Sequence, residues 1–222
     1  MAVIPARLDS SRLPGKVLAD LGGRPMIEHV WRRVVATGLF TRVVVASTDE
    51  PVLAWARAVG ADGVATEPAR DGTHRVSLVA RACPGSAVIN VQGDLPFVPS
   101  DHLQGLVGAL RGGAAVATLA APLTGPVDDP ARVKVLVGPP ARFSRRPLGG
   151  TPLVHIGLYG FGPGWVERCA AAPRSERARQ EDLEQLAWLD AGIEVSVIQV
   201  DRASPSVDTP DDLAQVRRAL DP

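Results

Sequence analysis

AVIPA at Ala2–Ala6, followed at once by RLDSSRLPGK at Arg7–Lys16, decides the fold of this chain. The first five residues form an apolar run of the kind that makes a buried strand. The segment after it carries Arg7, Arg12 and Lys16, so three positive charges follow the carboxyl end of that strand. In open α/β sheets, ligands bind outside the carboxyl ends of the strands. The stretch therefore predicts an α/β protein with an anion site; a solvated basic loop is the alternative.

The same segment offers neutral donors as well as charge. Ser10, Ser11 and the backbone N–H groups of a turn opened by Gly15 would suit phosphate oxygens. The segment matches neither the Walker A pattern nor the GxGxxG fingerprint, so these motifs do not decide which phosphate compound it binds.

Working outward, apolar runs alternate with helical periodicity through the first half of the chain. We expect strands at Arg42–Ala46, Asp62–Ala65 and Ala87–Val91, and helices at Pro25–Thr37, Pro51–Val59 and Thr73–Ala82. Such β-α steps predict a parallel, doubly wound, Rossmann-like sheet that is covered on both faces and joined by right-handed crossovers.

The second half alternates less regularly. Helices are expected at Pro99–Leu110, Ala178–Asp190 and Pro210–Leu220, and strands at Ala114–Ala121, Val133–Val137, Leu153–Phe161 and Glu194–Val200. The Pro- and Gly-rich stretch Gly138–Gly150 separates two of these strands. No shift in composition marks a boundary, and we therefore expect a single domain over residues 1–222.

Charge and cysteine content limit the possible partners. The chain has 222 residues with 24 basic and 24 acidic side chains, so no overall field draws it to nucleic acid or to a membrane. Cys83 and Cys169 lack CxxC spacing, and neither a leader pattern nor a membrane-length apolar run is seen. These features predict a cytoplasmic protein.

Two carboxylates stand where a metal-bound triphosphate would need them. Asp94 follows Gln92-Gly93 directly after the strand Ala87–Val91, and Asp208 precedes the last expected helix. A carboxylate beside a glycine, at the end of a strand, suits a divalent cation carried by a nucleotide. Each aspartate has a second interpretation, since Asp94 could cap the next turn and Asp208 the final helix.

The segment IPARLDSSRLPGK at residues 4–16 resembles the IPAR-x-x-S-[ST]-R-x-P-x-K signature of bacterial sugar-nucleotide cytidylyltransferases, above all those for 3-deoxy-manno-octulosonate (Kdo). Six further pieces resemble that family in the same order: DGTHRV (71–76), VINVQGDLP (88–96), FSR (143–145), HIGLYGF (155–161), LEQL (183–186) and VDTPDDL (207–213). The resemblance spans nearly the whole chain. It implies the fold of the nucleotide-diphospho-sugar transferases and, as a possible assembly, a homodimer.

The resemblance also implies a reaction. An acceptor oxygen would attack the α-phosphorus of CTP in line, and pyrophosphate would leave. Asp94 and Asp208 match the family's metal-binding positions and would hold Mg²⁺, while Arg12 and Lys16 would neutralise the leaving pyrophosphate. The remaining nucleotide-binding residues would be Arg7, Ser11, Thr73, Arg75 and Gln92.

Acceptor recognition would fall to Arg145, His155 and Gln185, again by resemblance. Arg145 offers a bidentate fork for a carboxylate. Two of these residues have structural alternatives, because His155 could be a hydrogen-bonded core histidine and Gln185 a surface residue.

Departures from the family pattern bear on the acceptor. Leu95 replaces an acidic residue beside Asp94, and only Arg146–Val154 joins FSR to HIGLYGF, where the family carries a longer segment. We therefore expect a smaller or more anionic acceptor than Kdo, such as a compact carboxylate or a phosphonate. Two other functions stay open: a nucleotide-binding module that has lost catalysis, and a uridylyl- or guanylyltransferase on the same fold.

Overall fold

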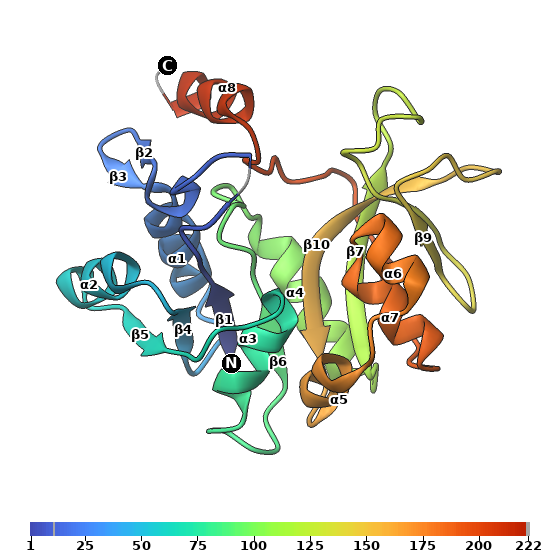
Figure 1. Cartoon of the computed structure of the whole chain (residues 1–222), viewed down its shortest axis with the longest axis horizontal. Helices are drawn as coiled ribbons and strands as arrows, with labels where there is room; N and C mark the ends of the chain where they lie inside the picture. Colours follow the sequence, from blue (N-terminus) through green and yellow to red (C-terminus); the bar gives the residue numbers. More distant parts are fainter. Residues whose placement is uncertain (11, 221–222) are drawn as a thin grey trace. The chain divides into compact units, whose positions relative to one another are not determined.

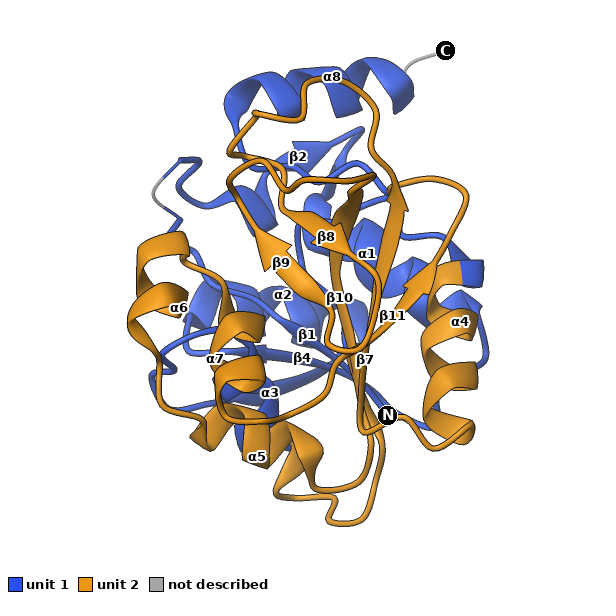
Figure 2. Cartoon of the chain, turned by 90° about the vertical axis from the view of Figure 1, so that its right-hand side faces the viewer, with its two compact units in different colours: residues 1–79, 90–101, 204–222 blue, residues 80–89, 102–203 orange. Residues whose placement is uncertain are grey.

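The structure is a computed structural model that describes residues 1–10 and 12–220 (Figure 1). Ser11 therefore lies outside the described residues. The chain divides into two compact units (Figure 2): unit 1 comprises Met1–Val79, Asn90–Asp101 and Ser204–Pro222, and unit 2 comprises Ala80–Ile89 and His102–Ala203. The expectation of a single domain stays a prediction. The α/β class with a mostly parallel central sheet is confirmed.

Unit 1 is built on parallel strands. They follow the order β6-β1-β4-β5, with β1 at Ala2–Pro5, β4 at Val43–Ser47, β5 at Asp62–Ala65 and β6 at Val88–Asn90, whose last residue belongs to this unit. β1 pairs with β4 and β4 with β5, both in parallel register. The chain moves outward from β1 through β4 to β5 and then returns to place β6 on the other side of β1. Ligands of doubly wound folds bind at such a reversal of strand order.

The helices of unit 1 follow their sequence signals closely. They are α1 at Met26–Ala36, α2 at Glu50–Val59, α3 at Gly72–Ala80 and α8 at Pro210–Leu220. α1 buries Met26, Ile27, Val30 and Val34, which recur at helical spacing. α2 has proline in its first turn and ends at Gly60, whose φ of 74° is left-handed. The expected positions are confirmed to within a few residues.

A small apolar cluster attaches α8 to the region that follows β1. The chain passes from a short 3-10 helix, η1 at Lys16–Leu18, into a hairpin of β2 at Asp20–Leu21 and β3 at Arg24–Pro25. Leu21 and Met26 pack there against Val207, Leu213 and Val216. The cluster therefore places the residues just before α8 near the amino-terminal part of the chain, which contains Arg7–Lys16.

Unit 2 contains a mixed sheet. β10 at Leu153–Phe161 pairs antiparallel with β7 at Val116–Pro122, and β11 at Ser196–Gln199 lies parallel to β7. β8 at Lys134–Leu136 pairs antiparallel with β10 and with β9 at Arg142–Ser144. The helices are α4 at Ser100–Arg111, which begins in unit 1, α5 at Trp165–Ala171, α6 at Glu176–Glu181 and α7 at Glu184–Asp190.

Three sequence expectations need correction in this half of the chain. The single helix expected at Ala178–Asp190 is wrong, because Asp182 adopts a left-handed φ of 48° and separates α6 from α7. Leu183 closes the break by donating its N–H to the carbonyl of Ala178 at 3.1 Å. β9 lies inside Gly138–Gly150, where no element was expected, and α5 was also missed. No helix among the described residues has the length and apolar character needed to cross a membrane.

The break at Asp182 gives a stability prediction. An L-residue in the left-handed region is strained and glycine is not, so Asp182→Gly should raise the free energy of unfolding by about 0.5 to 1 kcal/mol. The side chain of Asp182 is 80% exposed in its ion pair with Arg174, so the loss of this pair should offset only part of the gain. Urea unfolding measures the change, with Asp182→Val as a destabilised comparison. A glycine variant less stable than the wild type would contradict the assignment.

Candidate functional site

The basic segment after β1 forms a closed loop. Gly15 has a left-handed φ of 71° and donates its N–H to the carbonyl of Leu8 at 2.8 Å. Leu8 in turn donates its N–H to Asp49 Oδ2, just beyond β4, at 2.7 Å. The two hydrogen bonds join the loop to itself and to the segment after β4, and η1 then begins at Lys16.

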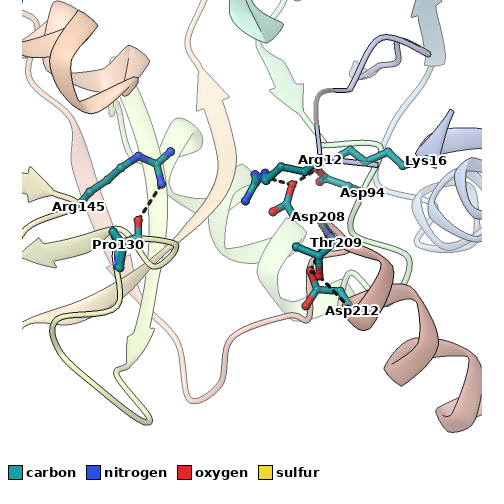
Figure 3. Close-up of polar contacts among 8 residues, drawn as sticks. All are labelled: Arg12, Lys16, Asp94, Pro130, Arg145, Asp208, Thr209 and Asp212. Carbon is teal, nitrogen blue, oxygen red and sulfur yellow. Dashed lines mark hydrogen bonds and ion pairs between the residues drawn. The ribbon is translucent and has the colours of Figure 1, made fainter. Parts of the chain in front are cut away.

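Four of the predicted site residues meet in unit 1 (Figure 3). Lys16 Nζ donates to Asp94 Oδ2 at 2.7 Å and to Asp208 Oδ1 at 2.9 Å. Arg12 lies 2.9 Å from the same Asp208 oxygen. The side chain of Lys16 is 14% exposed, whereas that of Arg12 is 55% exposed. Two carboxylates thus share one largely buried ammonium, and an exposed guanidinium pairs with one of them.

Local backbone contacts place Asp94. A Cβ at Gly93 would lie 3.3 Å from the carbonyl oxygen of Pro5, tighter than most such contacts, so glycine allows this loop to approach the end of β1. Val207 donates its N–H to the carbonyl of Asp94 at 2.9 Å and joins the segment before α8 to the same loop. The backbone therefore holds both carboxylates beside the basic loop.

The capping alternative for Asp208 is wrong, because other residues cap α8. Asp212 Oδ2 accepts the N–H groups of Asp208 at 3.0 Å and Thr209 at 2.8 Å, and Thr209 Oγ1 accepts the N–H of Asp212 at 3.2 Å. This reciprocal capping box leaves the Asp208 carboxylate to Lys16 and Arg12. The Asp94 carboxylate likewise contacts Lys16.

The two carboxylates of the cluster stabilise the charged form of Lys16. Burial alone would lower the pKa of Lys16, but attraction and hydrogen bonds from Asp94 and Asp208 outweigh burial, and the pKa is raised. Lys16 therefore stays protonated throughout the physiological range.

The other nucleotide-side residues have contacts of their own. Arg75 is buried and donates to Thr66 Oγ1 at 2.7 Å. Burial lowers the pKa of Arg75, nearby Asp49 raises it and Arg7 lowers it, so the three charges influence one another. Thr73 is also buried, and Gln92 donates to Asn90 Oδ1 at 3.3 Å. Their roles toward a nucleotide stay predictions.

Arg145 lies in unit 2 and is held by backbone groups. Its Nε donates to the carbonyl of Glu181 at 2.7 Å, and a terminal nitrogen donates to the carbonyl of Pro130 at 3.1 Å (Figure 3). Both acceptors are neutral, so these bonds orient the guanidinium without cancelling its charge. An anion could still pair with it.

Sequence reasoning missed the residues that hold Arg145. Lys134 is fully buried, and its Nζ donates to three backbone carbonyls: those of Asp129 at 2.6 Å, Arg132 at 2.9 Å and Arg145 at 2.7 Å. Glu181 Oε2 accepts the N–H of Arg145 at 2.6 Å and the hydroxyl of Ser144 at 2.8 Å. A lysine inside the apolar run Val133–Val137 was the available signal.

The other two acceptor-side residues lie in an aromatic environment of unit 2. His155 Nε2 is 2.9 Å from Thr118 Oγ1, and its ring meets that of Phe143 edge-on. Gln185 is buried and accepts a hydrogen bond from the Tyr159 hydroxyl at 3.1 Å, which excludes the surface alternative. Its Nε2 has no hydrogen-bond partner among residues 1–10 and 12–220. His155 has the contacts of the core alternative, and its role in binding an acceptor stays a prediction.

His155 gives a pH prediction. Burial, together with the positive charge of Arg145, lowers the pKa of His155 from 6.5 to about 3. Between pH 6.5 and pH 3 the unfolded chain binds a proton on His155 that the folded chain does not bind. The free energy of unfolding therefore falls as the pH is lowered through this window, and the contribution of His155 to stability is complete only above pH 6.5. His155→Gln should flatten the fall in unfolding free energy over this window by up to about 1.4 kcal/mol per pH unit. Unfolding in urea at several pH values tests this, and equal slopes for both proteins would contradict it.

Comparison with known proteins extends over nearly the whole chain. Residues 1–195 match a family described as cytidylyltransferase. A 3-deoxy-manno-octulosonate cytidylyltransferase of Anaeromyxobacter dehalogenans (strain 2CP-C) is 37% identical, across 98% of this chain and 96% of the relative. The enzyme of that name from Azorhizobium caulinodans is 41% identical, across 99% and 95%. The solved CMP:2-keto-3-deoxy-manno-octonic acid synthetase complexed with CTP has a TM-score of 0.92 and 33% identity, and the match covers 99% of this chain and 97% of that one.

Proposed function

The chain belongs to the cytidylyltransferase family, and we propose that it transfers a cytidylyl group from CTP to Kdo or a closely similar acid sugar, with release of pyrophosphate. It is accordingly an enzyme of the nucleotidyltransferase class. The observation that carries the proposal is the cluster of Arg12, Lys16, Asp94 and Asp208 at the end of β1. A homodimer and a cytoplasmic location stay predictions.

On the nucleotide side, the chain's own residues supply charge and position. Arg12 is exposed and can swing onto phosphate oxygens, and Lys16 can donate its three N–H bonds to them. Both would offset the charge that develops on the leaving pyrophosphate. Phosphoryl and nucleotidyl transfer depend mainly on such positioning and charge stabilisation.

The residues fit a divalent cation, which we take to be Mg²⁺. Asp94 Oδ2 and Asp208 Oδ1 both lie within hydrogen-bond distance of one atom, Lys16 Nζ, so a single cation can reach both. Mg²⁺ is commonly held by one or two carboxylates together with substrate phosphates. Bound there, it would polarise the α-phosphate and lower the pKa of the attacking hydroxyl.

On the acceptor side, Arg145 supports an acid as the substrate. Its guanidinium is oriented by two neutral carbonyls, and Gln185 Nε2 offers a donor that no described residue uses. Leu95 is a core residue, 4% exposed, so its side chain gives little ground for a smaller acceptor. We therefore propose Kdo, and a compact phosphonate is the alternative outcome of the acceptor test.

Pyrophosphate release measured with CTP, UTP, GTP and a panel of acceptors tests the proposal. We expect activity with CTP and Kdo, and a KM for the acceptor that rises about ten- to hundredfold in Arg145→Gln, because a hydrogen-bonded charge partner is lost. The KM for CTP should stay near the wild-type value. Arg146→Gln, which removes the neighbouring exposed charge, is the matched control.

Three outcomes of this assay would overturn the proposal. Nucleotide binding without pyrophosphate release from any acceptor would indicate a module that has lost catalysis. Preference for UTP or GTP would indicate another transferase, and preference for phosphonates another acceptor class.

The shared cation gives a second prediction. Asp94→Asn and Asp208→Asn keep size but remove charge, and each should lower kcat strongly and weaken the dependence on Mg²⁺. Because both carboxylates serve one ion, the double variant should lose less than the product of the two single losses. Asp211→Asn on the exposed first turn of α8 is the control. Losses that multiply would show that the two aspartates act on separate ions or in separate steps.

A further inference from the structure

The ammonium group of Lys16 lies where the carboxylates of Asp94 and Asp208 converge. We propose that Lys16 closes the metal site to free divalent ions, so that the metal enters only together with the nucleotide. The inference rests on the proposed function in one respect, namely that Asp94 and Asp208 are the metal ligands.

Lys16 and a metal ion held by the two aspartates would compete for the same oxygen atoms. Nζ lies 2.7 Å from Asp94 Oδ2 and 2.9 Å from Asp208 Oδ1 (Figure 3). A cation held by these two oxygens would compete with that nitrogen for the oxygen lone pairs that accept its hydrogen bonds. On this proposal the lysine gives up its two hydrogen bonds when a metal ion takes the same oxygens.

Displacement of Lys16 by a free ion is unfavourable. The lysine side chain is 14% exposed, and a buried ammonium that loses its partners costs several kcal/mol. The metal gains little in return, since the described residues contain no group of three or more acidic, histidine or cysteine side chains able to hold an ion. Mg²⁺ also gives up its water reluctantly.

A nucleoside triphosphate removes both obstacles. Its phosphate oxygens supply the missing metal ligands, and they also accept the hydrogen bonds that Lys16 gives up. Lys16 then moves from the carboxylates to the phosphates while the metal takes its place. Coupling of this kind is reciprocal, so the metal strengthens nucleotide binding by the same factor as the nucleotide strengthens metal binding.

The test measures Mn²⁺ binding to the full chain without nucleotide, by electron paramagnetic resonance. Lys16→Met should bind Mn²⁺ more tightly than the wild type, on the order of tenfold to a hundredfold. Lys16→Arg keeps the positive charge and should bind as weakly as the wild type. The double variant Lys16→Met/Asp94→Asn should lose the gain, which assigns the ion to these carboxylates.

Arg12→Met is the matched control for charge. It removes a cation that pairs with Asp208 alone and is 55% exposed, so its effect on Mn²⁺ affinity should be much smaller than that of Lys16→Met. An equal gain in Mn²⁺ affinity in Arg12→Met and Lys16→Met would show that the effect comes only from the loss of a nearby positive charge, and it would overturn the proposal. Tight Mn²⁺ binding by the nucleotide-free wild type would overturn it as well, even if every Lys16 variant failed to fold.

A second readout uses stability. Mn²⁺ should raise the melting temperature of Lys16→Met and leave that of the wild type unchanged, because a ligand stabilises the state that binds it. Neither measurement contains CTP or an acceptor, so failure of the proposed function would appear in the pyrophosphate assay and not here.

Discussion

The pairing of one ammonium with two carboxylates joins three distant segments of unit 1. Lys16 reaches Asp94 across 78 positions of sequence and Asp208 across 192. These contacts exist because β6 returns to the side of β1 and because the cluster around Leu21 and Val207 fixes the start of α8. Without that strand order the three charges would stand on separate loops. The site is thus a consequence of topology, and only its residue types are a local matter.

Much of unit 1 could be predicted because its local and global signals agree. Apolar runs, prolines in first turns and glycines at helix ends place the elements, and the basic segment after the first strand indicates the edge of the sheet that carries the candidate site. The sequence alone could not decide between the two possible roles of Asp208. A capping role and an ion-pairing role share one sequence pattern, and the capping box of Thr209 and Asp212 decides between them in space.

Unit 2 was harder to predict because its decisive contacts are tertiary. The local sequence does not show that the helix ends at Asp182, because an aspartate also occurs on the exposed face of a helix. Lys134 appears in sequence as a polar interruption of a strand, yet carbonyls from two separate segments surround its ammonium. The burial of Gln185 likewise depends on Tyr159, which lies on β10. The periodicity of a sequence shows which face of an element is apolar. It does not show which buried polar side chains will find hydrogen-bond partners.

Charge balance supports the proposal that a metal and a nucleotide bind to this cluster as a pair. Lys16 and Arg12 balance Asp94 and Asp208 in the free protein, so the cluster is neutral and internally bonded. A free divalent ion would add positive charge beside two cations, and a free triphosphate would add negative charge beside two carboxylates. A complex of metal and triphosphate would pair opposite charges: its metal ion would face the aspartates, and its phosphates would face Lys16 and Arg12. The proposed exchange would give the same four side chains two sets of partners: one another, as in the observed ion pairs, and the reactants in the proposed complex.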